Sequence, residues 1–355
     1  MYNASVHPVV FRFAFEAGTS RGVLREKTSW FIRLKKNEVE GWGECSPIAG
    51  LSPEPLEVIE AKIMTVLDEW QKDPAAILDS NSRWTEELRQ WPSLRFALET
   101  AWLDYTNGGV HTLYNNAFVK GMQAIPINGL VWMNTLEHMQ AQIEDKLKQG
   151  YQCLKLKIGH HDFAAELNLL KRLRDRFPTK ELMIRVDANG AYQKHTVYPM
   201  LEALAALDVH SIEQPVAAGQ MDLMSDLCKN SPLPIALDEE LIKHRLKEER
   251  ADLLHQLQPA YLVLKPSLHG GMMGCKEWIE LATQQNTGWW MTSYLESSIG
   301  LNAIAQFTCE YETSIFHGLG TGQIYTHTIA SPLEVQTGQL TYHPMKKWGS
   351  PLDLS

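Results

Sequence analysis

Two lysines alternate with apolar residues in the stretch 153–158, which reads Cys-Leu-Lys-Leu-Lys-Ile. The period of two predicts a β-strand with Lys155 and Lys157 on one face. Neighbouring ammonium groups repel each other, so we expect both lysine pKa values to fall from an ordinary value of about 10.4. Such a lysine can take up and return a proton near neutral pH. The alternative is an exposed strand face with two solvated lysines.

Carboxylates close three later apolar runs at an even interval. Asp187, Glu213 and Asp238 are 26 and 25 positions apart. That interval matches one strand–helix unit, and the carboxyl ends of parallel strands meet at the mouth of a (β/α) barrel. Three clustered carboxylates repel each other unless a cation lies among them. An all-oxygen ligand set without His or Cys favours Mg²⁺, with Mn²⁺ as the alternative.

A further lysine, Lys265, closes the next apolar run, 27 positions after Asp238. We expect Lys157 and Lys265 to face a small-molecule carboxylate substrate from two sides and to act as acid–base groups. A divalent cation that binds such a substrate stabilises the enediolate formed when the α-proton leaves. Each acid, taken alone, has the alternative role of a helix N-cap.

Polar neighbours of these residues leave alternatives open. Glu239 and Glu240 compete with Asp238 for the metal, but the strand phase and the 25-residue interval favour Asp238. Glu239 would then lie beside the metal ligands. Asn189 either orients the surroundings of Asp187 or turns the chain together with the glycine that follows.

Eight short apolar runs alternate with helical stretches after residue 120. They predict strands at residues 125–131, 153–158, 182–187, 209–213, 235–238, 261–265, 288–293 and 315–319. This rhythm is typical of a parallel (β/α) barrel, and the alternative is a sheet with helices on both faces. No Gly-x-Gly-x-x-Gly follows a first strand and no P-loop is present, which disfavours nucleotide-binding forms of that sheet.

The first 120 residues predict an α+β domain. Its expected elements are strands at 9–15, 28–34 and 41–45, a mobile loop at 17–23, a second loop at 45–53, a capped helix start at 52–55 and a helix at 93–105. The residues after 321 are too irregular for a barrel unit. We therefore expect a capping domain of residues 1–120, completed by residues 322–355, over a barrel domain of residues 121–321.

The composition indicates a globular protein with a sizeable core, since 44% of the residues are apolar. The net charge of −9 and the pI near 5.8 argue against a nucleic-acid-binding surface. We find no secretion signal and no window close to the roughly 20 apolar residues of a membrane span. Five scattered cysteines form no Cys-x-x-Cys pair. We therefore expect a reduced, cytoplasmic protein that binds neither nucleic acid nor membrane, and we predict no oligomeric state.

The order of these motifs resembles the enolase superfamily, in particular its muconate-lactonizing subgroup. The matching motifs are Lys-x-Lys, Asp-x-Asn, Glu-Gln-Pro, Asp-Glu and Lys-Pro on successive strands, with residues 41–47 and 95–99 in the first domain. The resemblance implies an α+β capping domain over a modified (β/α)7β TIM-like barrel. It also implies Mg²⁺ on the three acids, Lys157 as the base, Lys155 as the neighbour that sets its pKa, and Lys265 as the opposite lysine.

Residues 293–301 most resemble the o-succinylbenzoate synthase family of this subgroup, the dehydratases of menaquinone synthesis. The predicted substrate contacts are Arg185, Ser293, Ser297 and Gly318. Ser297 has the alternative role of a helix cap. Dipeptide epimerases of the subgroup carry Asp-x-Asp near the last strand, whereas residues 317–322 here contain no acid.

The resemblance implies a syn elimination of water from a succinyl-hydroxycyclohexadiene carboxylate. Lys157 would remove the α-proton and then protonate the departing hydroxyl, while Lys265 and the cation stabilise the enediolate. The succinyl arm would lie between the loops at 19–23 and 48–52 and the loops that follow the last two barrel strands. The alternatives are an N-acylamino acid racemase or other isomerase, an enzyme with both activities, and a non-catalytic metal-binding barrel, which has no need of two lysines.

Overall fold

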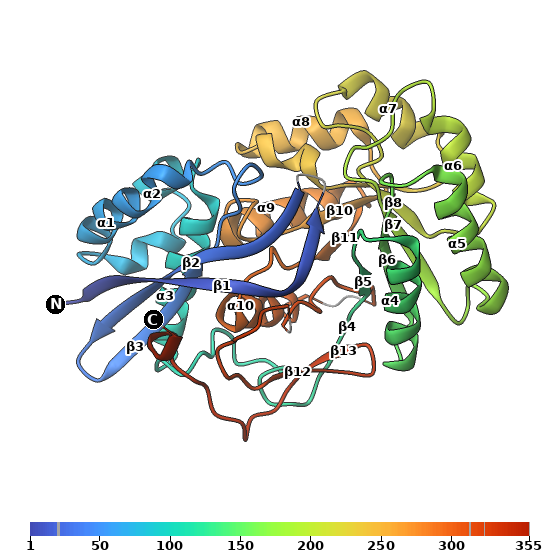
Figure 1. The fold of residues 1–355 in the computed structure, drawn as a ribbon. Helices are drawn as coiled ribbons and strands as arrows, with labels where there is room; N and C mark the ends of the chain where they lie inside the picture. Colours follow the sequence, from blue (N-terminus) through green and yellow to red (C-terminus); the bar gives the residue numbers. More distant parts are fainter. Residues whose placement is uncertain (20–21, 312–313, 323, 355) are drawn as a thin grey trace.

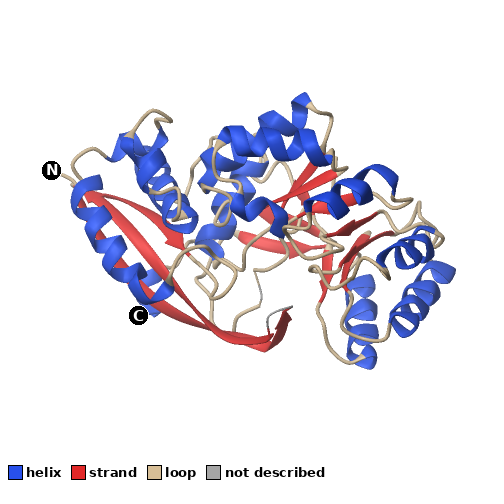
Figure 2. Cartoon of the chain, turned by 90° about the horizontal axis from the view of Figure 1, so that it is seen from above, coloured by secondary structure: helices blue, strands red, loops and turns tan. Residues whose placement is uncertain are grey.

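The computed structural model describes residues 1–19, 22–311, 314–322 and 324–354. An antiparallel sheet with its own helices forms one part, and a larger curled parallel sheet surrounded by helices forms the other (Figure 1). The two sheets remain separate when the chain is seen from above (Figure 2). Each part therefore has its own layer of helices against its own sheet.

The antiparallel sheet has the strand order β1-β2-β3. Its strands are β1 (Asn3–Thr19), β2 (Gly22–Lys36) and β3 (Val39–Cys45), and its helices are α1 (Ile59–Trp70), α2 (Arg83–Glu87) and α3 (Pro92–Thr106), with 3-10 turns at Leu56–Val58 and Pro74–Leu78. Gly43 allows α3 to approach β3, because a Cβ there would lie 1.9 Å from the carbonyl oxygen of Ala97. This close contact explains a glycine within the strand.

Two local predictions for this part were wrong. The predicted loop at residues 17–23 continues the hairpin in its described residues, with Gly18 paired to Val23 across a register shift that begins after Arg12. Residues 20 and 21 of that loop lie outside the described residues. The helix start at 52–55 has no side-chain cap, because Pro55 leads into a 3-10 turn before α1. The helix predicted at 93–105 is confirmed as α3.

The parallel sheet has the strand order β11-β10-β9-β8-β7-β6-β5. Its strands are β5 (Gly129–Val131), β6 (Cys153–Lys157), β7 (Met183–Asp187), β8 (Ser211–Glu213), β9 (Ile235–Leu237), β10 (Tyr261–Leu264) and β11 (Gly288–Met291). Instead of an eighth strand at 315–319, single bridges join His317 to Ile127 and Gly318 to Thr292. These bridges link residues 317 and 318 to both edges of the sheet and so close it. The predicted barrel is therefore confirmed, and the alternative of an open sheet is wrong.

Helices surround this barrel. They are α4 (Leu136–Lys148), α5 (Phe163–Arg176), α6 (Val197–Ala205), α7 (Met221–Asn230), α8 (Lys247–Leu257), α9 (Gly271–Gln284) and α10 (Ser298–Thr308), with a 3-10 turn at Glu239–Lys243. Among the helices of the described ranges, none has both the length and the apolar character that a bilayer crossing requires.

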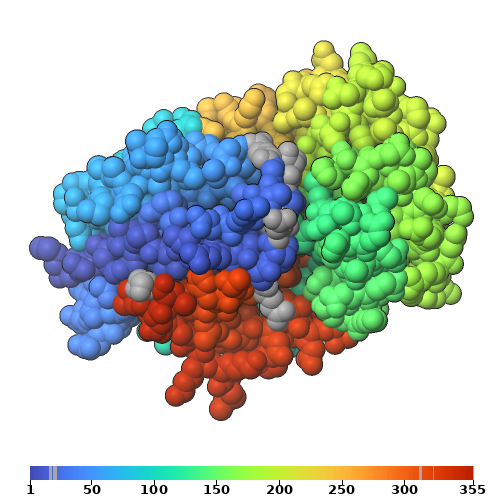
Figure 3. Space-filling model, in the orientation of Figure 1, coloured from blue at the N-terminus to red at the C-terminus, as the bar shows by residue number. Residues whose placement is uncertain are grey.

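The C-terminal segment contacts both parts of the chain. Strands β12 (Leu333–Gln336) and β13 (Gln339–Tyr342) pair with β4 (Ile125–Pro126), and a 3-10 turn covers Pro351–Leu354. Tyr325 bridges to Phe13 of β1, and Phe11 packs in the same apolar cluster as Ile329. The red C-terminal region lies along the blue N-terminal strands in Figure 3. Tyr325 and Ile329 thus pack with the first domain, whereas β13 pairs with a strand of the proposed barrel domain, and Leu340 and Tyr342 pack in the barrel core.

Two buried histidines support backbone groups of the barrel. His269 Nδ1 accepts a hydrogen bond from the Lys265 N–H, and His317 Nδ1 accepts one from the Met291 N–H, each at 3.0 Å. Burial lowers the pKa of both imidazoles to about 3. Both histidines are therefore neutral in the folded protein over most of the acidic range.

We expect the free energy of unfolding of the wild type to depend more steeply on pH than that of His317→Gln. An unfolded histidine takes up a proton near pH 6.5, whereas folded His317 does so only near pH 3. Folding stability from this group is therefore lost as the pH falls below 6.5, at about 1.4 kcal/mol per pH unit. Urea unfolding at pH 7 and pH 5 measures the difference. The exposed His255→Gln should keep the wild-type slope, and an unchanged slope in His317→Gln would contradict the assignment.

Candidate active site

The predicted acids and lysines end neighbouring strands of the barrel. Lys157 pairs in register with Asp187, and Asp187 pairs with Glu213. Asp238 follows β9 and Lys265 follows β10. Side chains from five strands therefore meet at the carboxyl end of the sheet, as expected for a barrel. We call this group the acid–lysine cluster, and its members are Lys155, Lys157, Asp187, Glu213, Asp238 and Lys265.

Lys155 lies between two carboxylates. Its Nζ atom is 3.0 Å from Asp187 Oδ2 and 2.5 Å from Glu213 Oε2. Burial by itself lowers the pKa of Lys155, but the charges of Asp187 and Glu213 outweigh burial and raise this pKa above its ordinary value. The expected fall in the pKa of Lys155 was therefore wrong, because neighbouring strands supply carboxylates that the lysine strand alone does not reveal.

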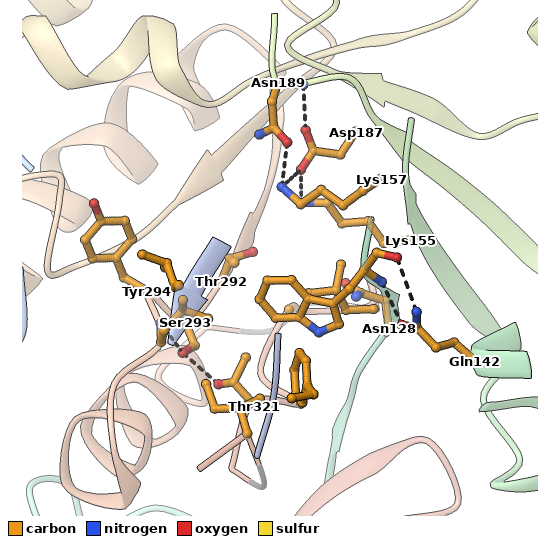
Figure 4. A pocket seen from close by; sticks show the side chains of 18 of the residues that line it. Asn128, Gln142, Lys155, Lys157, Asp187, Asn189, Thr292, Ser293, Tyr294 and Thr321 are labelled. Carbon is orange, nitrogen blue, oxygen red and sulfur yellow. Dashed lines mark hydrogen bonds and ion pairs between the residues drawn. The ribbon is translucent and has the colours of Figure 1, made fainter. Parts of the chain in front are cut away.

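Lys157 is held by two acceptors from β7 and the turn that follows it. Its Nζ atom donates to Asp187 Oδ2 at 2.8 Å and to Asn189 Oδ1 at 2.7 Å (Figure 4). Asn189 in turn donates from Nδ2 to Glu239 Oε1 at 3.0 Å. Asn189 also has a positive φ of 43°, so it both orients the lysine amine and turns the chain.

Lys265 pairs with Asp238 on the far side of the cluster. Its Nζ atom is 2.5 Å from Asp238 Oδ2. Burial opposes ionisation of both groups, yet their mutual attraction lowers the pKa of Asp238 and raises the pKa of Lys265. Lys157 lies on β6, and Lys265 lies at the end of β10. The strands that carry or precede the three acids, β7, β8 and β9, lie between these two in the sheet.

Several carboxylate oxygens here have no hydrogen-bond donor, namely Glu213 Oε1, Asp238 Oδ1 and Glu239 Oε2. Burial raises the pKa of Glu213 to about 8, with Asp187 adding to the effect. Within the described ranges, no three His, Cys, Asp or Glu side chains already form a complete ligand set, and the Lys155 ammonium lies between two of the acids. Buried oxygen atoms without donors nevertheless fit a hard divalent cation.

Glu240 is turned away from this group. Its Oε1 atom accepts from the Gly219 N–H at 2.9 Å, and its backbone N–H donates to Gln214 Oε1 at 3.2 Å. Glu239 lines the chamber beside Asp238. The side-chain directions therefore leave Asp238 and Glu239, and not Glu240, as neighbours of the acid–lysine cluster.

The cluster opens into a chamber of about 810 Å³ that both domains line. Lys155, Lys157, Asp187 and Asn189 lie at one side of this chamber, and Ser293 and Thr321 lie at another (Figure 4). The first domain contributes apolar side chains, among them Leu24, Ile48 and Leu51. The acid–lysine cluster therefore lies at one end of the chamber, the first domain supplies an apolar wall, and polar residues of α4, among them Asp145 and Lys146, line a further part.

The predicted substrate contacts differ in their placement. Ser293 and Gly318 line the chamber. Ser293 donates its proton to Glu296 Oε2 at 2.8 Å, and its oxygen accepts from Thr321 Oγ1 at 2.7 Å and from the Leu295 N–H at 3.1 Å. The donor and both acceptor positions of this hydroxyl are therefore already engaged within the protein.

Ser297 and Arg185 lie outside the chamber, contrary to expectation. Ser297 is the N-cap of α10 and donates from Oγ to Glu44 Oε2 at 2.6 Å, which confirms its alternative role. Arg185 is only 1% exposed and stacks over the Trp290 ring at 4.0 Å. Arg185 precedes Asp187 by two positions on β7 and so lies deeper in the barrel.

Sequence reasoning missed Thr292. Its Oγ1 atom is buried without a hydrogen-bond partner, and the residue lines the chamber beside Gly318. A Cβ atom at Gly318 would lie 2.5 Å from this oxygen. The period of two along β11 places Thr292 on the same face as Trp290, so the alternation alone predicts that the Thr292 side chain points into the barrel.

Glu44 joins the two domains. It is fully buried on β3, and its carboxylate accepts from Ser29 Oγ, from the N–H and Oγ of Ser297, and from the Gly300 N–H. A carboxylate at the N-terminus of a helix satisfies N–H groups that have no partner within the helix. This contact fixes the first domain against α10 and against the loop that precedes it.

Two family models match the chain. The model described as "Enolase C-terminal domain-like" matches residues 138–347, and the model described as "MenC, N-terminal domain" matches residues 10–105. The first covers the described acid–lysine cluster, and the second covers the strands that line the chamber from the other side.

Individual proteins agree with these models. An o-succinylbenzoate synthase from Desulfotalea psychrophila is 44% identical over 354 aligned residues, which cover 92% of this chain and 95% of that protein. The crystal structure of MenC from the same organism matches with a TM-score of 0.83 and 39% identity over 96% of this chain and 99% of that chain. A dipeptide epimerase from Enterococcus faecalis, solved with Mg and a dipeptide, has a TM-score of 0.84 at 16% identity, over 98% of this chain and 97% of that chain.

We expect Gly318→Ala to destabilise the protein by about 1–3 kcal/mol, because the new methyl group would overlap Thr292. Adding Thr292→Ala should recover most of this loss, since it removes both side-chain atoms nearest to the methyl group. Urea unfolding of the two single variants and the double variant measures the coupling. Additive free energies in the double variant would contradict the proposed contact.

Proposed function

Because this chain belongs to the enolase superfamily, and within it to the o-succinylbenzoate synthase family, we propose that it is a carbon–oxygen lyase of menaquinone synthesis. It removes water from a succinyl-hydroxycyclohexadiene carboxylate and releases o-succinylbenzoate. The acid–lysine cluster carries this proposal, since it combines buried carboxylates with two lysines on separate strands in one chamber. The comparison at 44% identity supports the same reaction.

Asp187, Glu213 and Asp238 would hold the metal. The oxygen atoms without donors and the absence of His or Cys among these residues fit Mg²⁺, with Mn²⁺ as the alternative. When bound, the ion would supply positive charge for a substrate carboxylate whose α-carbon loses a proton. Glu239 lies next to these acids, and burial together with their charges raises its pKa to about 7.

Lys157 is the proposed acid–base group. Asp187 and Asn189 hold its amine at the edge of the chamber, where a substrate α-carbon can approach it. In its neutral form Lys157 takes the α-proton, and as an ammonium it gives a proton to the departing hydroxyl. One group that performs both transfers acts on one face of the ring, so the elimination is syn.

Lys265 and Lys155 have electrostatic roles in this proposal. The Lys265 ammonium faces the cluster from the end of β10 and would stabilise negative charge on the substrate. Lys155 pairs with Asp187 and Glu213: its charge lowers the pKa of Asp187 and opposes the rise that burial causes in the pKa of Glu213. The product ring is aromatic, so the elimination is strongly downhill and the enzyme needs chiefly to lower the barrier to α-proton loss.

The succinyl arm would occupy the apolar part of the chamber. Leu24, Ile48 and Leu51 come from the first domain, and Tyr294 and Leu295 come from the loop after β11. We propose that these two sets of residues enclose the arm. The five cysteines are free thiols, which supports our proposal of a cytoplasmic enzyme.

Racemisation of N-acylamino acids is the second candidate function. It requires a proton donor on each face of the α-carbon, and Lys157 and Lys265 on separate strands meet that requirement. The stretch 317–322 contains no acid to hold a free substrate amine. The lack of an acid disfavours dipeptide epimerisation. N-acylamino acids are therefore the substrates whose racemisation should be compared with dehydration.

We expect Lys157→Met to lower the dehydration rate by at least about 10³-fold, because the variant lacks the proton carrier. Turnover of the cyclohexadiene substrate with Mg²⁺, followed by formation of o-succinylbenzoate, measures the rate. The exposed Lys171→Met should keep wild-type turnover. A wild-type protein without turnover would refute the function, and an active Lys157→Met would refute the role of this lysine.

Lys265→Met distinguishes the two candidate functions. Racemisation of an N-succinylamino acid, followed as loss of optical rotation, should be abolished because one face loses its proton donor, although Lys157 can still exchange the α-proton on its own face. Dehydration should fall by about 10²–10³-fold, since only a stabilising charge is lost. Equal, complete loss of both reactions would show that Lys265 transfers a proton in both.

We expect chelation of divalent cations to abolish turnover and added Mg²⁺ to restore it. Asp238→Asn should weaken Mg²⁺ binding at least about tenfold in calorimetry, because an amide carries no charge for the ion. Glu202→Gln, at an exposed position on α6, is the matched control and should bind Mg²⁺ as the wild type does. Full turnover in chelator, or unchanged Mg²⁺ affinity of Asp238→Asn, would exclude a metal at these acids.

A further inference from the structure

A buried lysine of the first domain reaches the loop that follows β11. Lys27 lies on β2 and is 7% exposed. Its Nζ atom donates to the carbonyl oxygens of Tyr294 and Leu295, both at 3.0 Å. The lysine therefore crosses from one domain to two consecutive backbone groups of the other, and the side chains of both these residues line the chamber.

The surroundings make this lysine costly to bury. Burial lowers the pKa of Lys27 to about 8, although Glu296 and Glu44 act in the opposite direction. Both acids are already engaged by other donors: Glu296 accepts from Ser267 and Ser293, and Glu44 accepts from Ser297. Backbone carbonyls are thus the direct partners of the Lys27 ammonium, and its position depends on the loop that carries them.

The loop needs such support because Leu295 adopts an unfavourable backbone conformation. Its φ angle is +60°, in the left-handed region that side chains other than glycine rarely adopt. Tyr325 of the C-terminal segment donates from its hydroxyl to the same Leu295 carbonyl at 2.5 Å. Two donors from distant parts of the chain therefore hold one strained residue.

The Leu295 side chain is part of the apolar chamber wall. It packs in the cluster formed by Ile48, Leu268 and Tyr294, together with Leu24. Release of its carbonyl would allow the backbone to leave the left-handed region and move this side chain away from Leu24 and Ile48. The wall between the first domain and the loop after β11 would then lose its shape.

We propose that Lys27 is a positioning residue that fixes Leu295 and Tyr294 in the chamber wall and so sets the fit of the substrate's acyl arm. This inference rests on the proposed dehydratase function, because it assigns that part of the chamber to the acyl arm. Lys27 touches neither the acid–lysine cluster nor the reacting atoms in this arrangement. It acts through the two carbonyls that it holds.

Replacement of Lys27 by Ala tests the proposal. We expect the KM for the cyclohexadiene substrate and the Kd for o-succinylbenzoate to rise about tenfold, with a much smaller change in kcat, because binding of the arm is affected more than proton transfer. Propylammonium added to the solution should restore both constants by replacing the missing ammonium. Lys35→Ala on the same strand removes an exposed ion pair with Glu40 and should leave all three constants unchanged.

Two further variants keep the proposal testable if Lys27→Ala does not fold. Lys27→Met retains most of the buried volume, and Tyr325→Phe removes only the second donor to the Leu295 carbonyl. Both should raise KM and leave kcat nearly unchanged. Unchanged KM in the folded variants, a loss confined to kcat, or no response of Lys27→Ala to propylammonium would overturn the proposal. Absence of turnover in the wild type would instead contradict the proposed function.

Discussion

Opposite charges buried at one end of the barrel impose the main constraint on this protein. Asp187, Glu213 and Asp238 are removed from water, and each needs a cation within a few ångströms. Lys155 and Lys265 supply that charge in the arrangement described here. The strand register must therefore be maintained closely, since a shift of one residue would turn these side chains out of the barrel. The proposed metal and acid–base roles depend on the same register.

The chamber exists because two domains meet over this end. The Glu44 carboxylate caps α10, and the Lys27 ammonium binds the loop after β11. Both groups are buried and charged, so separating the domains would expose ionic groups whose partners remain on the other side. The first domain is thereby held in a defined position over the barrel. Its apolar side chains, among them Ile48, can then shape a site whose charged groups belong to the other domain.

The division of labour between the domains bears on substrate choice. Charged groups at the barrel mouth suit any substrate that must lose a proton next to a carboxylate, which is why one fold serves dehydratases, epimerases and cycloisomerases. The discriminating contacts then belong to the chamber wall. Here that wall is apolar on the side of the first domain, whereas Asp145 and Lys146 of α4 line another part of it. A free substrate amine near the last strand would need a carboxylate partner there, and residues 317–322 contain none.

The sequence by itself determined the barrel, the capping domain and which acids and lysines face the barrel mouth. Period-two alternation and an even strand–helix interval are local properties, and they place Asp187 or Lys157 on a face without knowledge of the partner strands. The sign of the Lys155 pKa shift could not be obtained in this way, because it depends on carboxylates from neighbouring strands. The role of Ser297 and the depth of Arg185 were also decided by tertiary contacts, with Glu44 and with Trp290. A side-chain direction follows from local geometry, whereas a charge environment and a chamber wall exist only once distant segments have packed together.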